Sequence, residues 1–381
     1  MKIIIAPDSF KGSLRSPEVC AAIEAGIKSV LPDATIISIP MADGGEGTVE
    51  AAVISTGGHC EEVTVSGPLG VPVKACYGVP GGRPCAIMEM ASASGIELLP
   101  AEQLNPLKTS TCGTGEIIRA ICRKGIQEII IGIGGSATVD GGAGMAQALG
   151  FRFFDVDDKE LPQGIGGGAL DRISRVDCSM VEPSLKTCRI KVACDVTNPL
   201  LGLNGAARVF GPQKGATPEM VELLERNLAA YAEVLKHAGL CSGCDNPGDG
   251  AAGGLGFALR VLTKAQMVSG AELMIGITGL ENHLKGSDLL ITGEGCSDSQ
   301  TVNGKLCAVV AETAKRAGVP AVLLSGAVHG GSEVFGGLFA GAFSIASGPC
   351  TLQEAISATR QNLFSASANI AGLYKAARKL T

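Results

Sequence analysis

The sequence predicts an α/β protein with two domains, and three observations support this class. Short β-branched runs alternate with longer amphipathic stretches, which is typical of parallel strands joined by helices. A chain of 381 residues exceeds what one hydrophobic core usually supports. The 54 glycines cluster directly after the apolar runs, where a backbone that approaches a ligand closely needs residues without side chains.

The first part of the chain alternates strand and helix. Residues 2–6 form a continuous apolar run, which indicates a buried parallel strand. Ser16 followed by Pro17 is an N-cap and a first helical residue, so we expect a helix over residues 16–30. We expect strands over 35–39 and 61–65, the latter at a sheet edge, and a helix over 46–55.

The middle of the chain is richer in loops. Proline and glycine are frequent over residues 68–82, where we expect antiparallel strands. Further strands are expected over 85–90, 128–131 and 189–193, with helices over 114–124, 142–149 and 218–237. Long glycine-rich connections separate these elements.

The last part returns to the earlier pattern, with strands expected over 288–292, 321–325 and 342–345 and helices over 305–317 and 352–379. We therefore expect a Rossmann-like α/β domain that is split in sequence, residues 1–70 plus 287–381, and an inserted α/β domain, residues 71–286. Ligand loops are expected at the carboxyl ends of strands, facing a cleft between the domains.

Composition excludes several classes of partner. The net charge is -6 without any basic block, there is no Trp and aromatic content is 3%, so we expect no nucleic-acid binding. No apolar run approaches the ~18 residues of a membrane span, and the start MKIIIAPDS is typical of a buried strand rather than a signal peptide. We expect a cytoplasmic protein, either a monomer or a homodimer, whose 14 scattered cysteines are reduced. The single CxxC, Cys241 and Cys244 near His237, lacks a second pair and is interpreted as a plain loop.

Two loops near the start combine glycine with acidic residues. APDSFKGS after the first strand offers Asp8, Ser9 and Lys11, although a turn with an exposed lysine would have the same pattern. ADGGEGT offers Asp43 and Glu46 beside glycines that precede a helix. Backbone N–H groups there attract an anion and a neighbouring carboxylate attracts a divalent cation, while an Asp N-cap is the simpler alternative.

The loop GIGGSATVDGGAGM, residues 132–145, supports two interpretations. Gly132, Gly134 and Ala137 match GxGxxA, and Asp155 lies about twenty residues later, so an NAD-binding enzyme is a serious alternative. The loop is longer than a dinucleotide turn, however, and Ser136, Thr138 and Asp140 suit phosphate oxygens and magnesium better.

Two later loops add more polar groups. ACDVTNPLLG presents Asp195 and Asn198, acceptors suited to hydrated magnesium or a substrate hydroxyl, and Lys214 follows in VFGPQKGATPE. ITGEGCSDSQTVNGK presents Glu294, Asp298, Gln300, Thr301 and Lys305. There is no Walker A loop, GxSxG elbow or HExxH motif. The remaining features are those of phosphoryl transfer.

Six segments, in this order and spacing, resemble the bacterial glycerate kinases of the glyoxylate and glucarate degradation type: APDSFKGSL, ADGGEGTVEA, GIGGSATVDGGAGM, ACDVTNPLLG, FGPQKGATPEM and ITGEGCSDSQTVNGK. The resemblance covers essentially the whole chain. It implies ATP-dependent phosphorylation of D-glycerate to 2-phosphoglycerate with Mg²⁺, on a pair of Rossmann-like or flavodoxin-like domains. The sequence departs from the family pattern at Cys296, usually arginine, Val139, usually asparagine, and Asn303, usually histidine.

The resulting hypothesis assigns roles to individual residues. The candidate catalytic residues are Asp195 and Asp43, as proton acceptors, and Lys11 and Lys305, which would neutralise charge. ATP is expected to bind Gly134, Gly135, Ser136, Thr138, Asp140, Gly141, Gly142 and Lys214. Candidate substrate contacts are Asp8, Ser9, Glu46, Asn198, Glu294, Asp298 and Gln300, and Asp195 and Asp43 are the candidate Mg²⁺ ligands. Besides the NAD-dependent oxidoreductase, a kinase-derived protein with altered substrate or no activity is an alternative, motivated by Cys296 and Val139.

Overall fold

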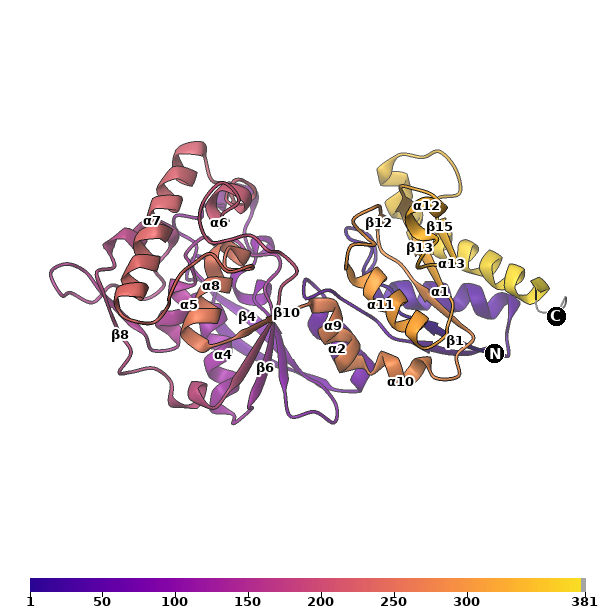
Figure 1. Ribbon diagram of the computed structural model, residues 1–381, viewed down its shortest axis with the longest axis horizontal. Coiled ribbons are helices and arrows are strands. Elements are labelled where there is room, and N and C mark those ends of the chain that lie inside the picture. The colour runs from indigo at the N-terminus through magenta and orange to yellow at the C-terminus, as the bar shows by residue number, and fades with distance from the viewer. Residues whose placement is uncertain (378–381) are drawn as a thin grey trace. The chain divides into compact units, whose positions relative to one another are not determined.

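The computed structural model describes residues 1–377, which form two compact units. Unit 1 comprises Met1–Asp43, Glu50–Gly57 and the described residues from Gly270 onward. Unit 2 comprises Gly44–Val49 and Gly58–Ser269. Each unit has its own β-sheet and its own helices (Figure 1), and the expected α/β class is confirmed.

The limits of the units differ from the boundaries expected at residues 70 and 287. Residues 58–70 contain β3 (His59–Ser66), which pairs in antiparallel register with β4 (Pro72–Val79) in the sheet of unit 2. The helix α9 (Gly270–Thr278) packs against α11 (Leu306–Arg316) within unit 1. The differences therefore come from pairing and packing across the expected boundaries. Residues 378–381 of the expected first domain lie outside the described residues.

The sheet of unit 1 has five strands, all parallel, in the order β15-β13-β11-β1-β2. These strands are β1 (Lys2–Ile5), β2 (Thr35–Ser38), β11 (Leu289–Thr292), β13 (Ala321–Ser325) and β15 (Gly341–Ser344). Because neighbouring strands are parallel, the loops that follow them all leave from the same edge of the sheet.

The two faces of this sheet are covered by different helices. Ile3 and Ile5 join a core with α1 (Ser16–Val30) and α13 (Leu352–Ala377), which lie against each other (Figure 1). Ile4 points to the opposite face, because side chains alternate along a strand, and it is fully buried. α11 contacts β11 and β13. Unit 1 also contains most of α2 (Thr48–Thr56) and all of α10 (Leu280–Leu284), α12 (Ser332–Phe335), β12 (Cys296–Ser297) and β14 (Ala327–Val328).

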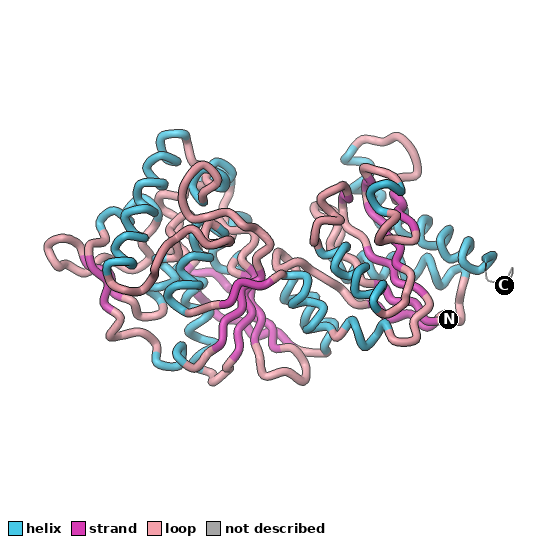
Figure 2. Tube along the Cα trace, viewed as in Figure 1, coloured by secondary structure: helices cyan, strands magenta, loops and turns pink. Residues whose placement is uncertain are grey.

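The sheet of unit 2 is mixed, with the order β10-β9-β6-β5-β4-β3. Figure 2 shows its strands in magenta. Its parallel part consists of β10 (Gln266–Val268), β9 (Arg189–Ala193), β6 (Glu128–Gly132) and β5 (Ala86–Glu89). The antiparallel strands β4 and β3 follow, and β4 lies within residues 68–82, where antiparallel strands were expected. The expected edge position of residues 61–65 is confirmed, although β3 lies in this sheet.

Helices and a large core complete unit 2. The α-helices are α3 (Ala91–Ser94), α4 (Cys112–Arg123), α5 (Ala143–Ala148), α6 (Ala206–Phe210), α7 (Pro218–His237) and α8 (Ala251–Thr263). The 3₁₀ helices are η1 (Ile96–Leu98), η2 (Ala101–Gln103), η3 (Gly167–Arg172), η4 (Pro183–Lys186) and η5 (Pro212–Lys214). The helix α7 begins with Thr217 as its N-cap, whose Oγ1 accepts the Met220 N–H at 3.3 Å.

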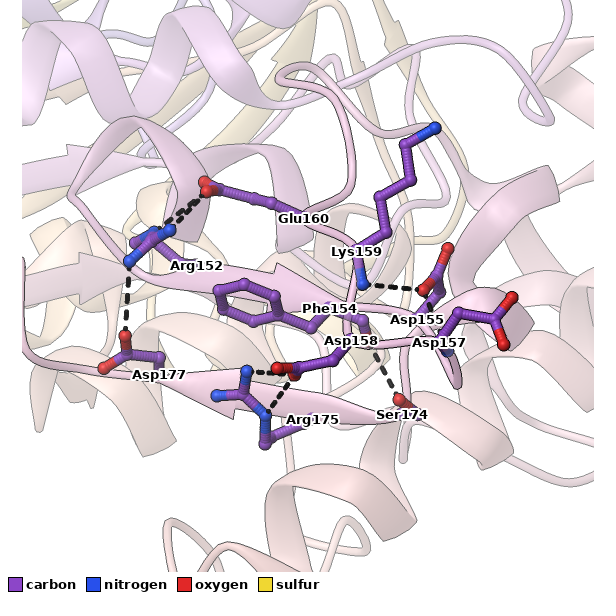
Figure 3. A network of polar contacts seen from close by, with 10 residues as sticks. All are labelled: Arg152, Phe154, Asp155, Asp157, Asp158, Lys159, Glu160, Ser174, Arg175 and Asp177. Carbon is purple, nitrogen blue, oxygen red and sulfur yellow. Dashed lines mark hydrogen bonds and ion pairs between the residues drawn. The ribbon is translucent and has the colours of Figure 1, made fainter.

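A small antiparallel sheet at the surface of unit 2 pairs β7 (Arg152–Phe154) with β8 (Arg175–Asp177). The ring of Phe154 lies between two guanidinium groups, 4.9 Å from that of Arg152 and 4.0 Å from that of Arg175 (Figure 3). Asp155 accepts the N–H groups of Asp157 and Lys159 at 3.1 and 2.9 Å. Asp155 therefore shapes the turn after β7 and is not placed as the acid of a dinucleotide fingerprint.

Candidate active site

Three carboxylates of unit 1 lie at neighbouring strand ends. Asp8 follows β1, Asp43 follows β2 and Glu294 follows β11. The Asp8 N–H donates to the Gly293 carbonyl at 2.8 Å, and its carboxylate accepts the Ser9 N–H at 2.6 Å. Burial, together with the negative charges of Asp43 and Glu294, raises the pKa of Asp8 to about 7. The fold thus brings three sequence-predicted acids together.

A chain of hydroxyl groups holds Glu294. Its Oε1 accepts hydrogen bonds from Ser297 Oγ at 2.9 Å and Thr301 Oγ1 at 2.7 Å. Ser297 Oγ lies 2.8 Å from Ser325 Oγ at the end of β13. These three hydroxyl-bearing residues are buried. Two donors on one oxygen fix the direction of the Glu294 carboxylate. Ser297 and Ser325 were not singled out from the sequence, because isolated serines carry no distinctive spacing.

The remaining candidates of unit 1 divide into turn-forming and exposed residues. Asp298 Oδ1 accepts the Gln300 N–H at 2.8 Å, so Asp298 shapes the turn that precedes α11. Gln300, Lys11 and Lys305 are exposed, and Lys305 stands at the N-cap position of α11. Both lysines are therefore accessible to an anionic ligand.

In unit 2, the Gly44–Gly45 segment lies against the carboxyl ends of β6 and β9 and against Gly134, which follows β6. A Cβ on Gly132 would lie 2.3 Å from the Gly44 carbonyl oxygen, and one on Gly134 would lie 3.1 Å from the Gly45 Cα. Gly44 has a φ of +95°, and a Cβ there would lie 2.5 Å from the Cβ of Ala193. Close approach of three backbones therefore explains the glycines at this edge of the sheet.

Glu89 is a site residue that the sequence analysis missed. It ends β5, and its Oε1 accepts the N–H of Val49, the second residue of α2, at 2.8 Å. A carboxylate at a helix N-terminus also interacts favourably with the helix dipole. Burial raises the pKa of Glu89 nonetheless. The sequence did contain a signal for Glu89. It lies near the end of the apolar run 85–90, and the other candidate acids also stand at or after strand ends.

Only the start of the 134–142 loop is exposed. Gly134 and Gly135 are accessible, whereas Ser136 to Gly142 are buried. The N–H groups of Gly141 and Gly142 donate to the Gly253 carbonyl at 3.0 Å and to Asp140 Oδ1 at 3.1 Å. Because these N–H groups already donate hydrogen bonds within the protein, they are not available to a phosphate. Of the cradle expected over residues 134–142, only Gly134 and Gly135 are exposed.

Asp140 holds this loop from inside unit 2. Its side chain is fully buried, and Oδ2 accepts hydrogen bonds from the Thr111 N–H at 2.8 Å, Thr111 Oγ1 at 2.7 Å and the Gly144 N–H at 3.2 Å. Burial raises the pKa of Asp140, although these hydrogen bonds oppose the rise. Its position is that of a structural anchor rather than of a ligand to magnesium.

Lys214 supports the same loop and is equally hidden. Only 1% of the residue is exposed, and Nζ donates to Ser136 Oγ at 2.6 Å and to the Thr138 carbonyl at 2.7 Å. Burial lowers the pKa of the amine to about 7, while the charge of Asp140 opposes the shift. Lys214 therefore lies behind Ser136 and not on the exposed side of the loop.

Asp195 and Asn198 lie on the loop after β9. Asp195 is exposed, and so is Glu46 on the loop between β2 and α2. Asn198 Nδ2 donates to the Asn204 carbonyl at 2.8 Å, and the Asn198 carbonyl accepts the Gly250 N–H at 2.9 Å. Asn198 consequently shapes the loop that presents Asp195.

The three departures from the family pattern occupy different environments. Val139 is fully buried in the core of unit 2, so its identity concerns packing. Cys296 is exposed on β12. Asn303 is also exposed, and its Nδ2 donates to the Ser299 carbonyl at 3.0 Å. Of these three residues, Cys296 and Asn303 are accessible to a ligand.

The CxxC segment packs against the core of unit 2. Cys241 and Cys244 are partly buried against the core of unit 2, and burial raises the pKa of both thiols. Across residues 1–377, no group of three or more His, Cys, Asp or Glu side chains is arranged to hold a metal ion. No helix within this range is long and apolar enough to cross a membrane.

Comparisons with known proteins cover the whole chain. The sequence model described as the Glycerate kinase family matches residues 3–375. The chain is 48% identical over 380 residues to a protein of Escherichia coli K12 named Glycerate 2-kinase, covering 97% of each. It is 44% identical over 381 residues to the Glycerate kinase of Bacillus subtilis 168, covering 100% of this chain and 99% of the relative. A crystal structure of a protein assigned as glycerate kinase 2 of Salmonella typhimurium LT2 superposes with a TM-score of 0.88 at 46% identity, covering 100% of this chain and 99% of that chain.

Proposed function

The chain belongs to the glycerate kinase family, and from this premise we propose that it transfers the γ-phosphoryl group of ATP to D-glycerate and forms 2-phosphoglycerate. Members of this family are phosphotransferases with an alcohol acceptor. The observation that carries the proposal is the full-length similarity to relatives named glycerate kinase or glycerate 2-kinase. The identity of the phosphorylated hydroxyl follows the name of the Escherichia coli relative.

We place glycerate at the loops of unit 1. Exposed Lys11 and Lys305 would neutralise the substrate carboxylate or the transferred phosphoryl group. Asp8, Ser9 and Glu294 lie at the strand ends that bear these loops and would contact the hydroxyl groups. For the proton acceptor we retain Asp195, with Asp43 second. Because the transition state is loose, positioning and charge neutralisation contribute most of the rate.

We place the phosphates of ATP at Gly134, Gly135 and Ser136. The first two are exposed, and Lys214 supports Ser136 from behind, so its contribution would be indirect. Mg²⁺ enters with the nucleotide as MgATP and needs only one or two protein carboxylates besides phosphate oxygens. Asp43 and Asp195 are exposed carboxylates that suit this limited role.

ADP release from MgATP tests this function, with D-glycerate, L-glycerate and a reaction without acceptor run side by side. We expect turnover with D-glycerate alone, and a product that enolase consumes without a mutase. Asp195→Asn should lower kcat by roughly 10²- to 10⁴-fold, whereas Asp171→Asn, an exposed acid of the same unit, should leave it unchanged. Folded protein that binds ATP but releases no ADP would point to the altered kinase, and enhanced NADH fluorescence would point to the oxidoreductase.

A further inference from the structure

The loop that presents Asp195 is backed by residues 243–250. The Gly250 N–H donates to the Asn198 carbonyl at 2.9 Å, and the Leu200 N–H donates to the Cys244 carbonyl at 3.2 Å. The contact is tight, because a Cβ on Gly250 would lie 2.2 Å from the Pro199 carbonyl oxygen. Residues 243–250 therefore hold the main chain of residues 198–200, which follow Asp195 on the same loop. We call residues 243–250 the buttress.

An ion pair fixes the buttress. The Asp249 side chain is 1% exposed and accepts two parallel hydrogen bonds from Arg260 of α8, Nε to Oδ1 at 2.7 Å and Nη2 to Oδ2 at 2.8 Å. Arg260 Nη2 also donates to the Gly243 carbonyl at 3.0 Å, and Asp249 Oδ2 accepts the Asn246 N–H at 3.0 Å. A two-point contact of this kind sets both distance and orientation, which a single ammonium group cannot do.

The chain between Asp249 and Arg260 contains an irregular turn near the start of α8. Ala252, Gly253 and Gly254 have positive φ values of 52°, 68° and 91°. Left-handed backbone at a residue with a side chain, such as Ala252, is unfavourable unless its surroundings impose it. The Gly253 carbonyl accepts the Gly141 N–H at 3.0 Å, so this irregular turn also supports the loop anchored by Asp140.

We propose that Arg260 and Asp249 are positioning residues for phosphoryl transfer, because their ion pair sets the orientation of the loop that presents Asp195. The proposal rests on the proposed function. In this proposal neither Arg260 nor Asp249 contacts a ligand. Both act on the Asp195 loop through the two main-chain hydrogen bonds that Leu200 and Gly250 donate. A displacement of about 1 Å in such a loop is enough to lower a rate by roughly 10²-fold.

The chain offers a matched control on the surface of unit 2. Arg152 also donates Nε to a carboxylate, that of Glu160 at 3.0 Å, and also lies over an aromatic ring, that of Phe154 (Figure 3). Arg260 likewise pairs with Asp249 and lies over the Phe257 ring, whose centroid is 5.8 Å away, but it contacts both carboxylate oxygens and Asp249 is buried. The two arginines differ in what the ion pair supports, because Arg152 belongs to the peripheral β7–β8 sheet.

The test compares Arg260→Lys with Arg152→Lys. Each change keeps the positive charge and removes the guanidinium fork. We expect Arg260→Lys to lower kcat by roughly 10- to 100-fold and to change KM for ATP by less than about threefold, as loss of an orienting interaction requires. Arg152→Lys should retain kcat within about twofold. In hydrogen exchange, the amides of Leu200 and Gly250 should exchange faster in Arg260→Lys alone.

Several outcomes overturn the proposal. Undiminished kcat in Arg260→Lys would do so, as would unchanged exchange at Leu200 and Gly250, or equal losses in both lysine variants. If Arg260→Lys does not fold, Asp249→Asn serves as the second variant, because it keeps one acceptor for Arg260 and should show the same pattern of kcat and exchange. A wild-type chain without glycerate-dependent ADP release would defeat the proposed function instead, and the exchange measurement would still decide whether Arg260 fixes the loop.

Discussion

Replacing Lys214 by methionine tests whether a buried amine that titrates near neutral pH supports the loop of residues 134–142. The amine is fully buried beside Ser136 and Thr138, and burial lowers its pKa from 10.5 to about 7. Each unit of difference between the pKa in the folded state and the pKa in the unfolded state corresponds to about 1.4 kcal/mol. Keeping Lys214 charged therefore costs the folded state on the order of 5 kcal/mol. Methionine has similar length and removes this cost, but leaves the Thr138 carbonyl without a donor, at about 1–3 kcal/mol.

The sign of the pH dependence follows from proton binding. Between pH 7 and pH 10.5 the unfolded chain keeps a proton on Lys214 that the folded chain has lost. The unfolded state therefore binds more protons, and the stability of the wild type rises with pH through this window. Methionine does not titrate. As the pH rises from 7 to 10.5, the free energy of unfolding of the wild type should therefore increase relative to that of Lys214→Met by on the order of 3–5 kcal/mol.

Urea unfolding of both proteins between pH 6 and pH 10 measures this difference. Lys236→Met on α7 is the control, because Lys236 is exposed and its pair with Glu233 contributes little. We also expect a higher KM for ATP in Lys214→Met, since Ser136 loses its supporting donor. A stability difference that stays constant within about 1 kcal/mol across this range would refute the assignment of a buried, titrating amine at residue 214.

Two further predictions concern the strand-end loops. Asp8→Asn should raise the melting temperature at pH 8 in EDTA and lower turnover. The pKa of Asp8 is raised from 3.8 to about 7, so ionised Asp8 destabilises the fold above pH 7. An unchanged or lower melting temperature would contradict this reasoning. Gly132→Ala should destabilise unit 2 by about 1–3 kcal/mol and reduce activity, since the new methyl group would lie 2.3 Å from the Gly44 carbonyl oxygen. Gly372→Ala, with no atom within 4 Å of the added Cβ, should show neither effect in calorimetry and ADP-release assays.

Much of the fold was predictable because it follows from local patterns. The apolar runs at residues 2–6 and 128–131 correspond to β1 and β6, and their length and continuity are those of strands covered on both faces. The six motifs also indicate the family by themselves, because each is a contiguous segment of the chain. The unit limits were less predictable. β3 and β4 form a hairpin, and residues 59–66 alone do not indicate that this hairpin joins the sheet of unit 2.

The candidate site shows a similar division. Polar residues after strands pointed to Asp8, Asp43 and Glu294, since parallel strands bring their carboxyl ends to one edge. Glu89 and Arg260 were missed for a physical reason. Each acts on main-chain atoms of a segment far along the chain, Val49 and Gly243, and such contacts leave no local pattern.

The sequence by itself determined the α/β class, the strand-end loops and the family, whereas only the tertiary structure decided what each acid can do. Asp43 and Asp140 stand in the same tripeptide, DGG, and from the sequence both were candidates for ATP or magnesium. Asp43 is exposed, whereas Asp140 is fully buried and accepts hydrogen bonds from Thr111, Gly142 and Gly144. Solvation and hydrogen-bond partners set the chemistry of a carboxylate, and both depend on residues distant in the chain.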